Sequence, residues 1–413
     1  MKNNELLLLN ASFAIGEKIV SVSASDYTTW CITESGDLYG CGRNDHGQQG
    51  DGTTKDVRVF TKRAENVAQV KATNYTTWYL TNDNELFGCG LGADGQQGSG
   101  GTSDVLVFTK RWTKVVDFAC SEKTTWLAQK STGRPWYGCG DNTYGQQGSG
   151  DRNNVLTFTK RFNNSTGVVI ATNTNTIFTQ PEDSIYREYI YFAGRNVYGQ
   201  FGNGTTEDIL SFTAIVDSAR GSFRGDSSGD TIFYLVYPNY PKRAGRNDFG
   251  QLGTGNTTNL TTFQTSSTWM TDVFALSQET TFLGQSLNYD LNASGRNNYG
   301  QLGRGNTTNA TSFVKVATDA RKVWVSNSTS WYKNGNNNLY GCGRNDYGQQ
   351  GANNTTNVLS FAKRAEGVTD VCANELTTWY LTEDGNLFGC GDNTYGQQGD
   401  MVASYVSKFK KRN

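Results

Sequence analysis

The segment Gly42-Arg-Asn-Asp-His-Gly-Gln-Gln-Gly50 places three glycines, an asparagine and paired glutamines in nine residues. It decides the fold because it returns along the whole chain. Eight copies of the pattern Gly-Gln-x-Gly begin at Gly47, Gly95, Gly145, Gly199, Gly250, Gly300, Gly348 and Gly396. The steps between them are 48 to 54 residues long. A period of this length is typical of a propeller or a solenoid.

Each repeat also contains four short runs with strand character. In the last copy, "TTWYLT" and "NLFGCG" flank a hairpin turn at residues 383–386. A further run after the motif is β-branched and aromatic, as in "VRVF" at 57–60. No segment has helical periodicity. The sequence therefore predicts an all-β chain, a single domain over residues 1–413, folded as a closed β-propeller with four-stranded blades.

The pattern G-x-N-x-x-G-Q-x-G resembles the signature of the regulator-of-chromosome-condensation repeat family, and the match covers nearly the whole chain. This resemblance implies a β-propeller, usually with seven blades. The full motifs occupy residues 42–50, 90–98, 140–148, 194–202, 245–253, 295–303, 343–351 and 391–399. Eight complete copies favour eight blades, with seven as the alternative. The chain departs from the family in lacking the tryptophan before the first motif glycine, and Gly92 replaces the asparagine of the second copy.

We interpret the motif as architecture rather than as a binding loop. Gly47 and Gly50 allow positive φ and a close approach of backbone where one blade meets the next. The side-chain amides of Asn44 and Gln48 can satisfy backbone groups in such a turn. No Lys-Ser/Thr pair follows, as a phosphate-binding loop would require.

Two terminal segments fit the same strand position. Residues 5–15, "ELLLLNASFAI", align with the strand that precedes each repeat, and residues 404–412, "SYVSKFKKR", take that position after the last copy. Either segment could complete a blade shared between the two ends of the chain. The other would then be free to pair with a neighbouring subunit by edge addition.

The cysteines and the single histidine exclude several kinds of chemistry. Five of the eight cysteines recur at one repeat position, too far apart for disulfides, so we expect reduced, buried thiols and synthesis in the cytoplasm. No classical secretory signal and no membrane-spanning run is recognisable. His46 occupies a position that is aromatic in other copies, and no second histidine could complete a catalytic set or a metal site. We therefore expect no enzyme activity, no metal and no cofactor.

Two features divide the repeats into two arcs. Copies one, two, three, seven and eight carry a tryptophan in the second strand, whereas copies four to six carry Ile177, Ile232 and Phe282 there. The same five copies end in basic clusters: Lys62, Arg63, Lys110, Arg111, Lys160, Arg161, Lys363, Arg364, Lys410, Lys411 and Arg412. These clusters either bind a polyanion or protect an edge strand from aggregation, and the second interpretation is favoured. The tryptophans are interpreted as core rather than as stacking platforms.

The middle arc has longer hairpins that are rich in tyrosine. Tyr186, Tyr189, Tyr237 and Tyr240 are candidates for a protein interface, because tyrosine combines a large contact area with a polar tip. The alternative is a simple insertion in an exposed loop.

Three functions follow as hypotheses. The favoured one is a non-enzymatic binding or structural propeller with protein partners in a multi-subunit assembly. The Asn/Thr/Gly-rich composition is similar to that of phage particle proteins and favours a virion component for capsid decoration or tail adhesion. The family resemblance implies the first alternative, a guanine-nucleotide exchange factor for a small GTPase, with the insertion around residues 181–188 as its nearest candidate wedge. The second alternative is a glycan-binding adhesin, for which exposed aromatic and Asn side chains are suited.

Overall fold

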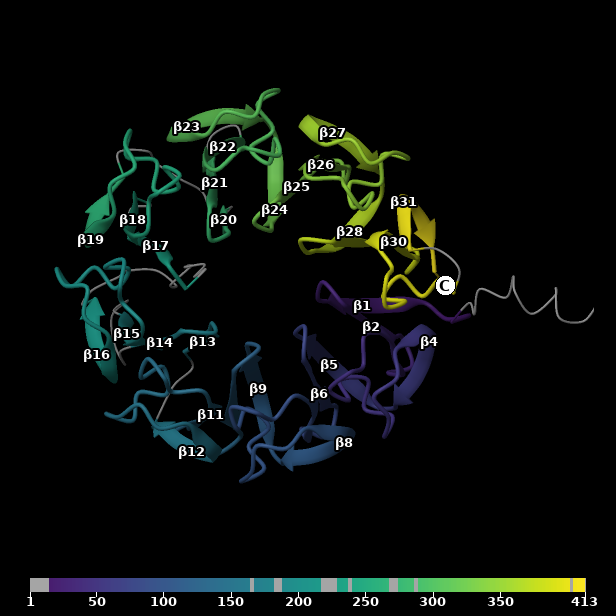
Figure 1. Ribbon diagram of the computed structural model, residues 1–413, viewed down its shortest axis with the longest axis vertical. Helices are drawn as coiled ribbons and strands as arrows, with labels where there is room; N and C mark the ends of the chain where they lie inside the picture. The colour runs from purple at the N-terminus through teal and green to yellow at the C-terminus, as the bar shows by residue number, and fades with distance from the viewer. Residues whose placement is uncertain are drawn as a thin grey trace, which may run out of the picture.

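The computed structural model describes residues 15–163, 167–181, 188–216, 229–236, 240–266, 274–285, 289–401 and 404–412. Within these ranges the chain forms 31 strands in eight antiparallel sheets, which stand around a central axis as the blades of a ring (Figure 1). A search of the same ranges finds no helix that is long and apolar enough to cross a membrane. The predicted all-β propeller with eight blades is confirmed, and the seven-bladed alternative is wrong because every repeat builds a sheet of its own.

The blades follow the chain in order. Blade 1 holds β1 (Ile19–Ala24), β2 (Thr28–Thr33), β3 (Leu38–Gly42) and β4 (Val57–Ala64). Blade 2 holds β5 (Val67–Ala72), β6 (Thr76–Thr81), β7 (Leu86–Gly90) and β8 (Val105–Trp112). Blade 3 holds β9 (Val115–Cys120), β10 (Thr124–Gln129), β11 (Trp136–Gly140) and β12 (Val155–Phe162). Blade 4 holds β13 (Val169–Ala171), β14 (Asn175–Pro181), β15 (Glu188–Gly194) and β16 (Ile209–Val216).

The second half of the ring repeats this order. Blade 5 has three described strands, β17 (Thr231–Val236), β18 (Tyr240–Gly245) and β19 (Leu260–Thr265). Blade 6 holds β20 (Phe274–Leu276), β21 (Thr280–Gln285), β22 (Asp290–Gly295) and β23 (Ala310–Ala317). Blade 7 holds β24 (Ala320–Val325), β25 (Thr329–Asn334), β26 (Leu339–Gly343) and β27 (Val358–Ala365). Blade 8 holds β28 (Val368–Ala373), β29 (Thr377–Thr382), β30 (Leu387–Asp392) and β31 (Tyr405–Lys411).

The ring closes between blade 8 and blade 1 without a shared sheet among the described strands. β31 pairs with β30 of its own repeat, and β1 pairs with β2. The expected shared closing blade is therefore not observed, because the eighth repeat supplies all four of its strands. Residues 5–14 of the N-terminal candidate lie outside the described residues. Instead, the Ile19 amide donates to the Gly385 carbonyl at 2.9 Å, and the Arg58 guanidinium donates to the Thr394 carbonyl at 3.0 Å.

The motif loop lies between the third and fourth strand of each blade and packs on the next blade. A Cβ on Gly50, at φ +64°, would lie 2.3 Å from the ring of Phe108 in blade 2. Asn44 organises the same loop: its Nδ2 donates to the carbonyls of Thr53 and Lys55 at 3.0 and 3.1 Å, and its Oδ1 accepts the Gln49 amide at 2.8 Å. The interpretation of the motif as architecture is confirmed.

The first motif glutamine ties every blade to the next one. Its Nε2 donates to a backbone carbonyl in the turn between the first and second strand of the following blade, at 2.9 to 3.3 Å. The eight pairs are Gln48–Asn74, Gln96–Glu122, Gln146–Asn173, Gln200–Gly229, Gln251–Gln278, Gln301–Asn327, Gln349–Glu375 and Gln397–Asp26. The last pair closes the ring with the same contact that builds it.

The repeated tryptophans form the core of the five similar blades. Trp30, Trp78, Trp126, Trp331 and Trp379 have no exposed surface. Each ring covers a glycine of the third strand, where an added Cβ would come within 2.4 to 2.6 Å of it. Each ring also meets a phenylalanine of the next blade edge-to-face, with centroids 5.7 to 6.2 Å apart. The interpretation of these tryptophans as core is confirmed.

The cysteines are packing groups. All eight are free, six of them are buried, and Cys120 and Cys372 are half-buried. The five at the repeat position donate from Sγ to the carbonyl of the first motif glutamine of the preceding blade, at 3.3 to 3.4 Å. In blade 6, Ser294 makes the same contact to Gln251. The expected burial is confirmed for six of the eight thiols, and their reduced state stays a prediction.

The contact between tryptophan and glycine predicts a coupled pair of substitutions. Gly341→Ala should destabilise the protein by about 1–3 kcal/mol, because the methyl group would overlap the Trp331 ring. Trp331→Phe should relieve most of this loss, since blade 6 already combines Phe282 with Ala293 at the equivalent positions. Chemical denaturation of the single and double variants gives the coupling. Gly101→Ala is the control, because no atom lies within 4 Å of its added Cβ. Additive effects of the two substitutions would contradict this account.

Candidate functional site

The antiparallel order of the strands gives the ring two different faces. The turn between the first and second strand and the motif loop between the third and fourth strand lie at the same end of every blade. We call this side the motif face. The hairpins between the second and third strand and the links between blades lie at the other side, the hairpin face.

A belt of half-buried aromatic rings runs around the motif face. The residue before the second motif glycine supplies it in seven blades: His46, Tyr144, Tyr198, Phe249, Tyr299, Tyr347 and Tyr395. Blade 2 has Asp94 at this position. His46 behaves as the expected packing ring, because it meets Tyr75 edge-to-face at 5.7 Å. Its Nδ1 also lies 2.8 Å from Oδ2 of Asp104.

Arginines fill the spaces between these rings. Five blades carry an arginine after the first motif glycine: Arg43, Arg195, Arg246, Arg296 and Arg344. Each guanidinium lies over two or three aromatic rings, 5.3 to 5.9 Å from their centroids. From blade 3 to blade 7 the result is a continuous alternation of arginine and aromatic ring. We call these arginines and rings together the Arg–aromatic belt.

Carboxylates hold the belt arginines in place. Arg246 pairs with Asp248 at 2.8 Å and with Asp230 at 3.7 Å, and Arg344 pairs with Asp346 at 2.7 Å. Because their charges are partly neutralised, these side chains offer planar, oriented contact surface rather than free positive charge. The belt was not predicted from the sequence, although the recurring Gly-Arg-Asn triplet places an arginine at the same position of five repeats.

Inside the belt, the turns between the first and second strands hold one another through side chains. The Asn74 Oδ1 accepts the Asp26 amide at 3.1 Å, and the Asn173 Oδ1 accepts the Glu122 amide at 3.0 Å. At the closing junction, the Asp26 Oδ1 accepts the Leu376 amide at 3.1 Å. The turns between the first and second strands stand around the axis of the ring, and we call them together the inner circle.

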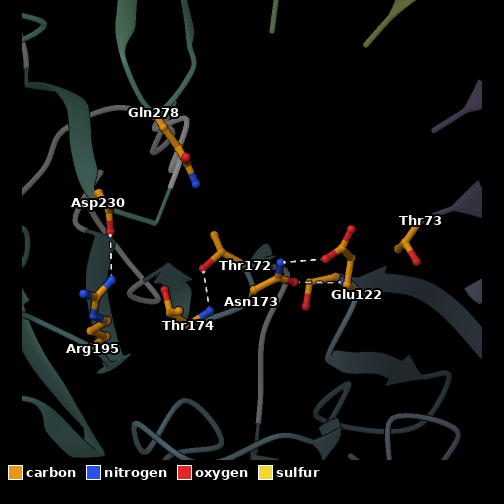
Figure 2. Close-up of a pocket in the computed structure, with 9 residues that line it drawn as sticks. Thr73, Glu122, Thr172, Asn173, Thr174, Arg195, Asp230 and Gln278 are labelled. Carbon is orange, nitrogen blue, oxygen red and sulfur yellow. Dashed lines mark hydrogen bonds and ion pairs between the residues drawn. The ribbon is translucent and has the colours of Figure 1, made fainter. Parts of the chain in front are cut away.

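A polar cavity of about 370 Å³ opens within this circle (Figure 2). Its lining comprises Thr73, Ser121, Glu122, Thr172, Asn173, Thr174, Arg195, Asp230 and Gln278. Arg195 and Asp230 pair across one side at 3.7 Å, and Asn173 donates to the Glu122 carboxylate at 3.2 Å. The lining offers hydroxyls, amides and one ion pair, which suit hydrogen bonding to a polar group of a partner. A search of the described residues finds no group of three or more His, Cys, Asp or Glu that could hold a metal ion.

Asp26 is the most perturbed carboxyl group of the face. Burial, and second to it the charge of Glu375, raise the pKa of this carboxyl group to about 6, against the opposing effect of the Leu376 and Glu375 amides. Asp26 is therefore mostly ionised at neutral pH, and holding this charge in a buried position costs stability at the junction between blades 8 and 1.

The lysines and the arginines of the predicted basic clusters lie in different surroundings. Lysines lie exposed on the outermost strands, where Lys62 pairs with Asp37, Lys110 with Glu85 and Lys410 with Asp400, at 2.7 to 2.8 Å. The arginines turn inward instead. Burial lowers the pKa of Arg111, Arg161, Arg364 and Arg412, and Arg63 pairs with Asp51 at 3.2 Å. The arginine of each cluster is therefore a packing group, while Lys160, Lys363 and Lys411 are exposed like the other lysines.

The predicted tyrosine-rich hairpins are only partly described. Tyr189 is half-buried and lies 6.4 Å from the ring of Tyr191. Tyr240 pairs through its backbone with Val236, whereas Tyr186 and Tyr237 lie outside the described residues. Their role as an interface stays a prediction.

Comparison with protein-family models matches residues 19–48 and 368–397 to the regulator of chromosome condensation (RCC1) repeat. Two of the eight repeats, those of blades 1 and 8, are thus similar to the RCC1 repeat. The matched segments run from the first strand to the first motif glutamine of blades 1 and 8, the part of the repeat that makes the contact between blades. A search of curated protein sequences gives no match.

Solved structures share the propeller fold. The chain is similar to human WBSCR16, with a TM-score of 0.61 and 15% identity over 80% of this chain and 94% of the other. It is also similar to yeast RCC1 (Prp20) bound to Kap60, with a TM-score of 0.58 and 14% identity over 91% of this chain and 83% of the other. At these identities the likeness shows the fold alone.

The charge of Asp26 predicts a pH-dependent stability of the closing junction. Folding raises the pKa of this carboxyl group from 3.8 to about 6. The group therefore stabilises the folded protein fully at a pH below 3.8, and this stabilisation is lost as the pH rises through about 6. When the pH is raised from 4.5 to 7.5, the free energy of unfolding of Asp26→Asn should therefore rise by about 1–3 kcal/mol relative to that of wild type. Denaturant unfolding at both pH values measures it. Asp384→Asn, in an exposed hairpin, controls for the loss of one charge. A constant difference between Asp26→Asn and wild type across this range would refute the assignment.

Proposed function

We propose that this propeller is a non-enzymatic, protein-binding scaffold that docks its partners on the motif face. The observation that supports this most directly is the Arg–aromatic belt. Tyrosine and arginine are the residues most enriched where binding energy concentrates in protein interfaces. Here they stand half-buried in fixed positions, so that little side-chain freedom remains to be lost on binding.

The repeat family is consistent with such a role. RCC1-like propellers are typically protein-binding scaffolds, and the yeast RCC1 structure named above holds a protein partner, Kap60. The cavity inside the inner circle adds hydrogen-bonding groups beside the belt. A partner that covers this face would therefore meet aromatic anchors at the periphery and polar groups at the centre.

The absence of enzyme activity is part of this proposal. The only histidine is held between Asp104 and the Tyr75 ring, and the five core tryptophans are buried. The Ser and Thr hydroxyls of the cavity pair with turn amides, as Thr172 Oγ1 does with the Asn175 amide at 3.0 Å. The eight free thiols support the proposal that the chain is made in a reducing compartment, the cytoplasm.

The three more specific hypotheses, a virion component, a nucleotide-exchange factor and a glycan-binding adhesin, differ in the observations that support them. A virion component rests on composition alone, and neither similar structure named above is described as one. Nucleotide exchange on a small GTPase rests on family resemblance, and residues 182–187 of its candidate wedge lie outside the described residues. For a glycan-binding adhesin, the five core tryptophans are excluded as stacking groups because they are buried, while other aromatic side chains such as the belt tyrosines and Tyr405 are accessible.

Site-specific photocrosslinking tests the docking face. A benzophenone amino acid at Tyr198, Tyr299 or Tyr347 should crosslink a common partner in extracts of the source cells. The same group at Lys160 or Lys363, on the outer strands, should not. With that partner purified, Tyr299→Ala and Arg344→Ala should each weaken binding about tenfold or more, with unchanged melting temperatures. Crosslinks confined to the outer positions would favour the polyanion or edge-strand interpretation and end this proposal.

A further inference from the structure

The turns of the inner circle are joined by a recurring hydrogen bond. One position in the turn carries a polar side chain in seven blades: Asp26, Asn74, Glu122, Asn173, Gln278, Asn327 and Glu375. At six junctions among the described residues, the side chain at this position accepts an N–H group from the turn of the preceding blade. The donor–acceptor pairs are Leu376–Asp26, Asp26–Asn74, Asn74–Glu122, Glu122–Asn173 and Gln278–Asn327, at 2.9 to 3.1 Å, and Asn327–Glu375.

Blade 5 has Gly229 at this position, so it provides no side chain that could reach back to blade 4. The equivalence is fixed by the Gly229 carbonyl, which accepts the Gln200 amide as its counterparts in the other blades accept theirs. At the Gly229 φ of +87°, an added Cβ would lie 3.3 Å from Oγ1 of Thr172 and 3.4 Å from Oγ1 of Thr174. Both threonines line the cavity of about 370 Å³. A side chain at this position would therefore enter the cavity.

Three polar groups at the cavity have no hydrogen-bond partner among the described residues. They are the backbone N–H of Asn173, the hydroxyl of Thr174 and the side-chain amide of Gln278. The pattern of the inner circle would pair the Asn173 N–H with blade 5, as the Glu122 N–H pairs with Asn173 Oδ1 at 3.0 Å. Figure 2 shows the Gln278 side chain extending toward the turn that holds Asn173. Unpaired donors and acceptors therefore lie on two sides of the opening.

The charges around the cavity disfavour a further ion. Arg195 and Arg246 are balanced by Asp230 and Asp248. The Glu122 carboxylate accepts side-chain amides on both oxygens, at 2.9 and 3.2 Å, and has no cationic partner among the described residues. A carboxylate ligand would be repelled by Glu122, because like charges disfavour ionisation of each other.

A neutral side-chain carboxamide fits the unpaired groups better than either kind of ion. It has one acceptor oxygen and two N–H donors, whereas an ammonium group has no acceptor. An ammonium ligand would therefore leave the Asn173 N–H without a partner. The carboxamide also resembles the side chains that hold this position in blades 2, 4, 6 and 7, namely Asn74, Asn173, Gln278 and Asn327.

We propose that this cavity receives the carboxamide of an asparagine or glutamine side chain of the protein that docks on the motif face. The carboxamide oxygen accepts the Asn173 N–H, and its N–H groups bond to Thr174 and Gln278. The partner thus supplies the polar group that Gly229 does not provide. The inference rests on the proposed docking face and specifies what the partner places at its centre.

The first test uses the full chain and small probes. Nα-acetyl-asparagine methylamide is titrated into ¹⁵N-labelled protein, and the backbone amide signal of Asn173 reports binding by NMR. The glutamine, aspartate, lysine and leucine compounds are titrated in parallel. The asparagine or the glutamine compound should bind at least about tenfold more tightly than the leucine compound, because of its hydrogen bonds. Equal binding of the leucine compound, preference for an ionic compound, or an Asn173 signal that moves with none of them would overturn the proposal.

Two substitutions assign the binding to this cavity. Gly229→Asn provides a carboxamide from within the chain and should abolish binding of the asparagine compound, since asparagine tolerates positive φ better than most residues. Gln278→Leu should reduce the affinity of the asparagine compound to that of the leucine compound, and it decides the question if Gly229→Asn does not fold. Gln264→Leu, at an exposed position of β19, is the matched control and should leave binding unchanged. Wild-type affinity in both cavity variants would overturn the proposal.

The partner that crosslinks from the belt separates this inference from the proposed function. Gly229→Asn and Gln278→Leu should each weaken binding of that partner by about tenfold, while the crosslinks from Tyr299 still form at saturating concentration. Wild-type affinity for the partner in both variants would leave the docking face in place and end the inference about the cavity. Absence of crosslinks from the belt of the otherwise unchanged protein would instead end the proposed function and the partner's role with it.

Discussion

The ring depends on one recurring hydrogen bond, made by the side-chain amide of a glutamine. The first motif glutamine of each blade donates to a carbonyl in the inner turn of the next blade, and this contact occurs at all eight junctions. The glutamine has no exposed surface in any blade, so its side-chain amide would be buried without this partner if the bond were lost. Because the closing junction has the same contact, between Gln397 and Asp26, the ring closes without a strand shared between its ends. Closure is thus a property of the repeat rather than of the termini.

The two arcs of the ring reflect two solutions to the same packing problem. In blades 1, 2, 3, 7 and 8 a tryptophan lies over glycine, a thiol reaches the preceding motif loop, and a second glutamine follows the first. In blades 4 to 6, Phe201, Leu252 and Leu302 replace that second glutamine, and Phe192, Arg243 and Ala293 replace the glycine. In blade 5 the strand register places Phe233 opposite Arg243, so Phe233 takes the tryptophan position and the expectation of Ile232 there is wrong. These exchanges occur together because a close-packed interior accepts volume at one position only when it is removed at another. A cavity of about 410 Å³ lies between blades 6 and 7, where the two arcs meet.

The candidate surfaces follow from this framework. Each motif loop presents one side chain before its asparagine and one before its second glycine, and the loops stand side by side around the face. An arginine from one blade therefore lies between aromatic rings of two blades, as Arg246 lies between Tyr198 and Phe249. The belt has no counterpart within a single repeat, because it exists only between neighbours. The same is true of the cavity between blades 6 and 7, which combines a short residue of one blade with the rings of the next.

The sequence by itself determined the fold class, the role of Gly50 and Asn44, and the burial of the tryptophans and of most thiols, and it favoured eight blades over seven. These features depend on local backbone requirements and on periodic patterns, which are readable along the chain. Only the tertiary structure decided between eight and seven blades, how the ring closes, that the arginine of each basic cluster turns inward, and where Arg195, Arg246 and their neighbours meet aromatic rings. It also decided that burial beside Glu375 perturbs Asp26. The physical reason is that these properties belong to junctions: they depend on distances between residues about fifty positions apart, or at opposite ends of the chain, which no single repeat contains.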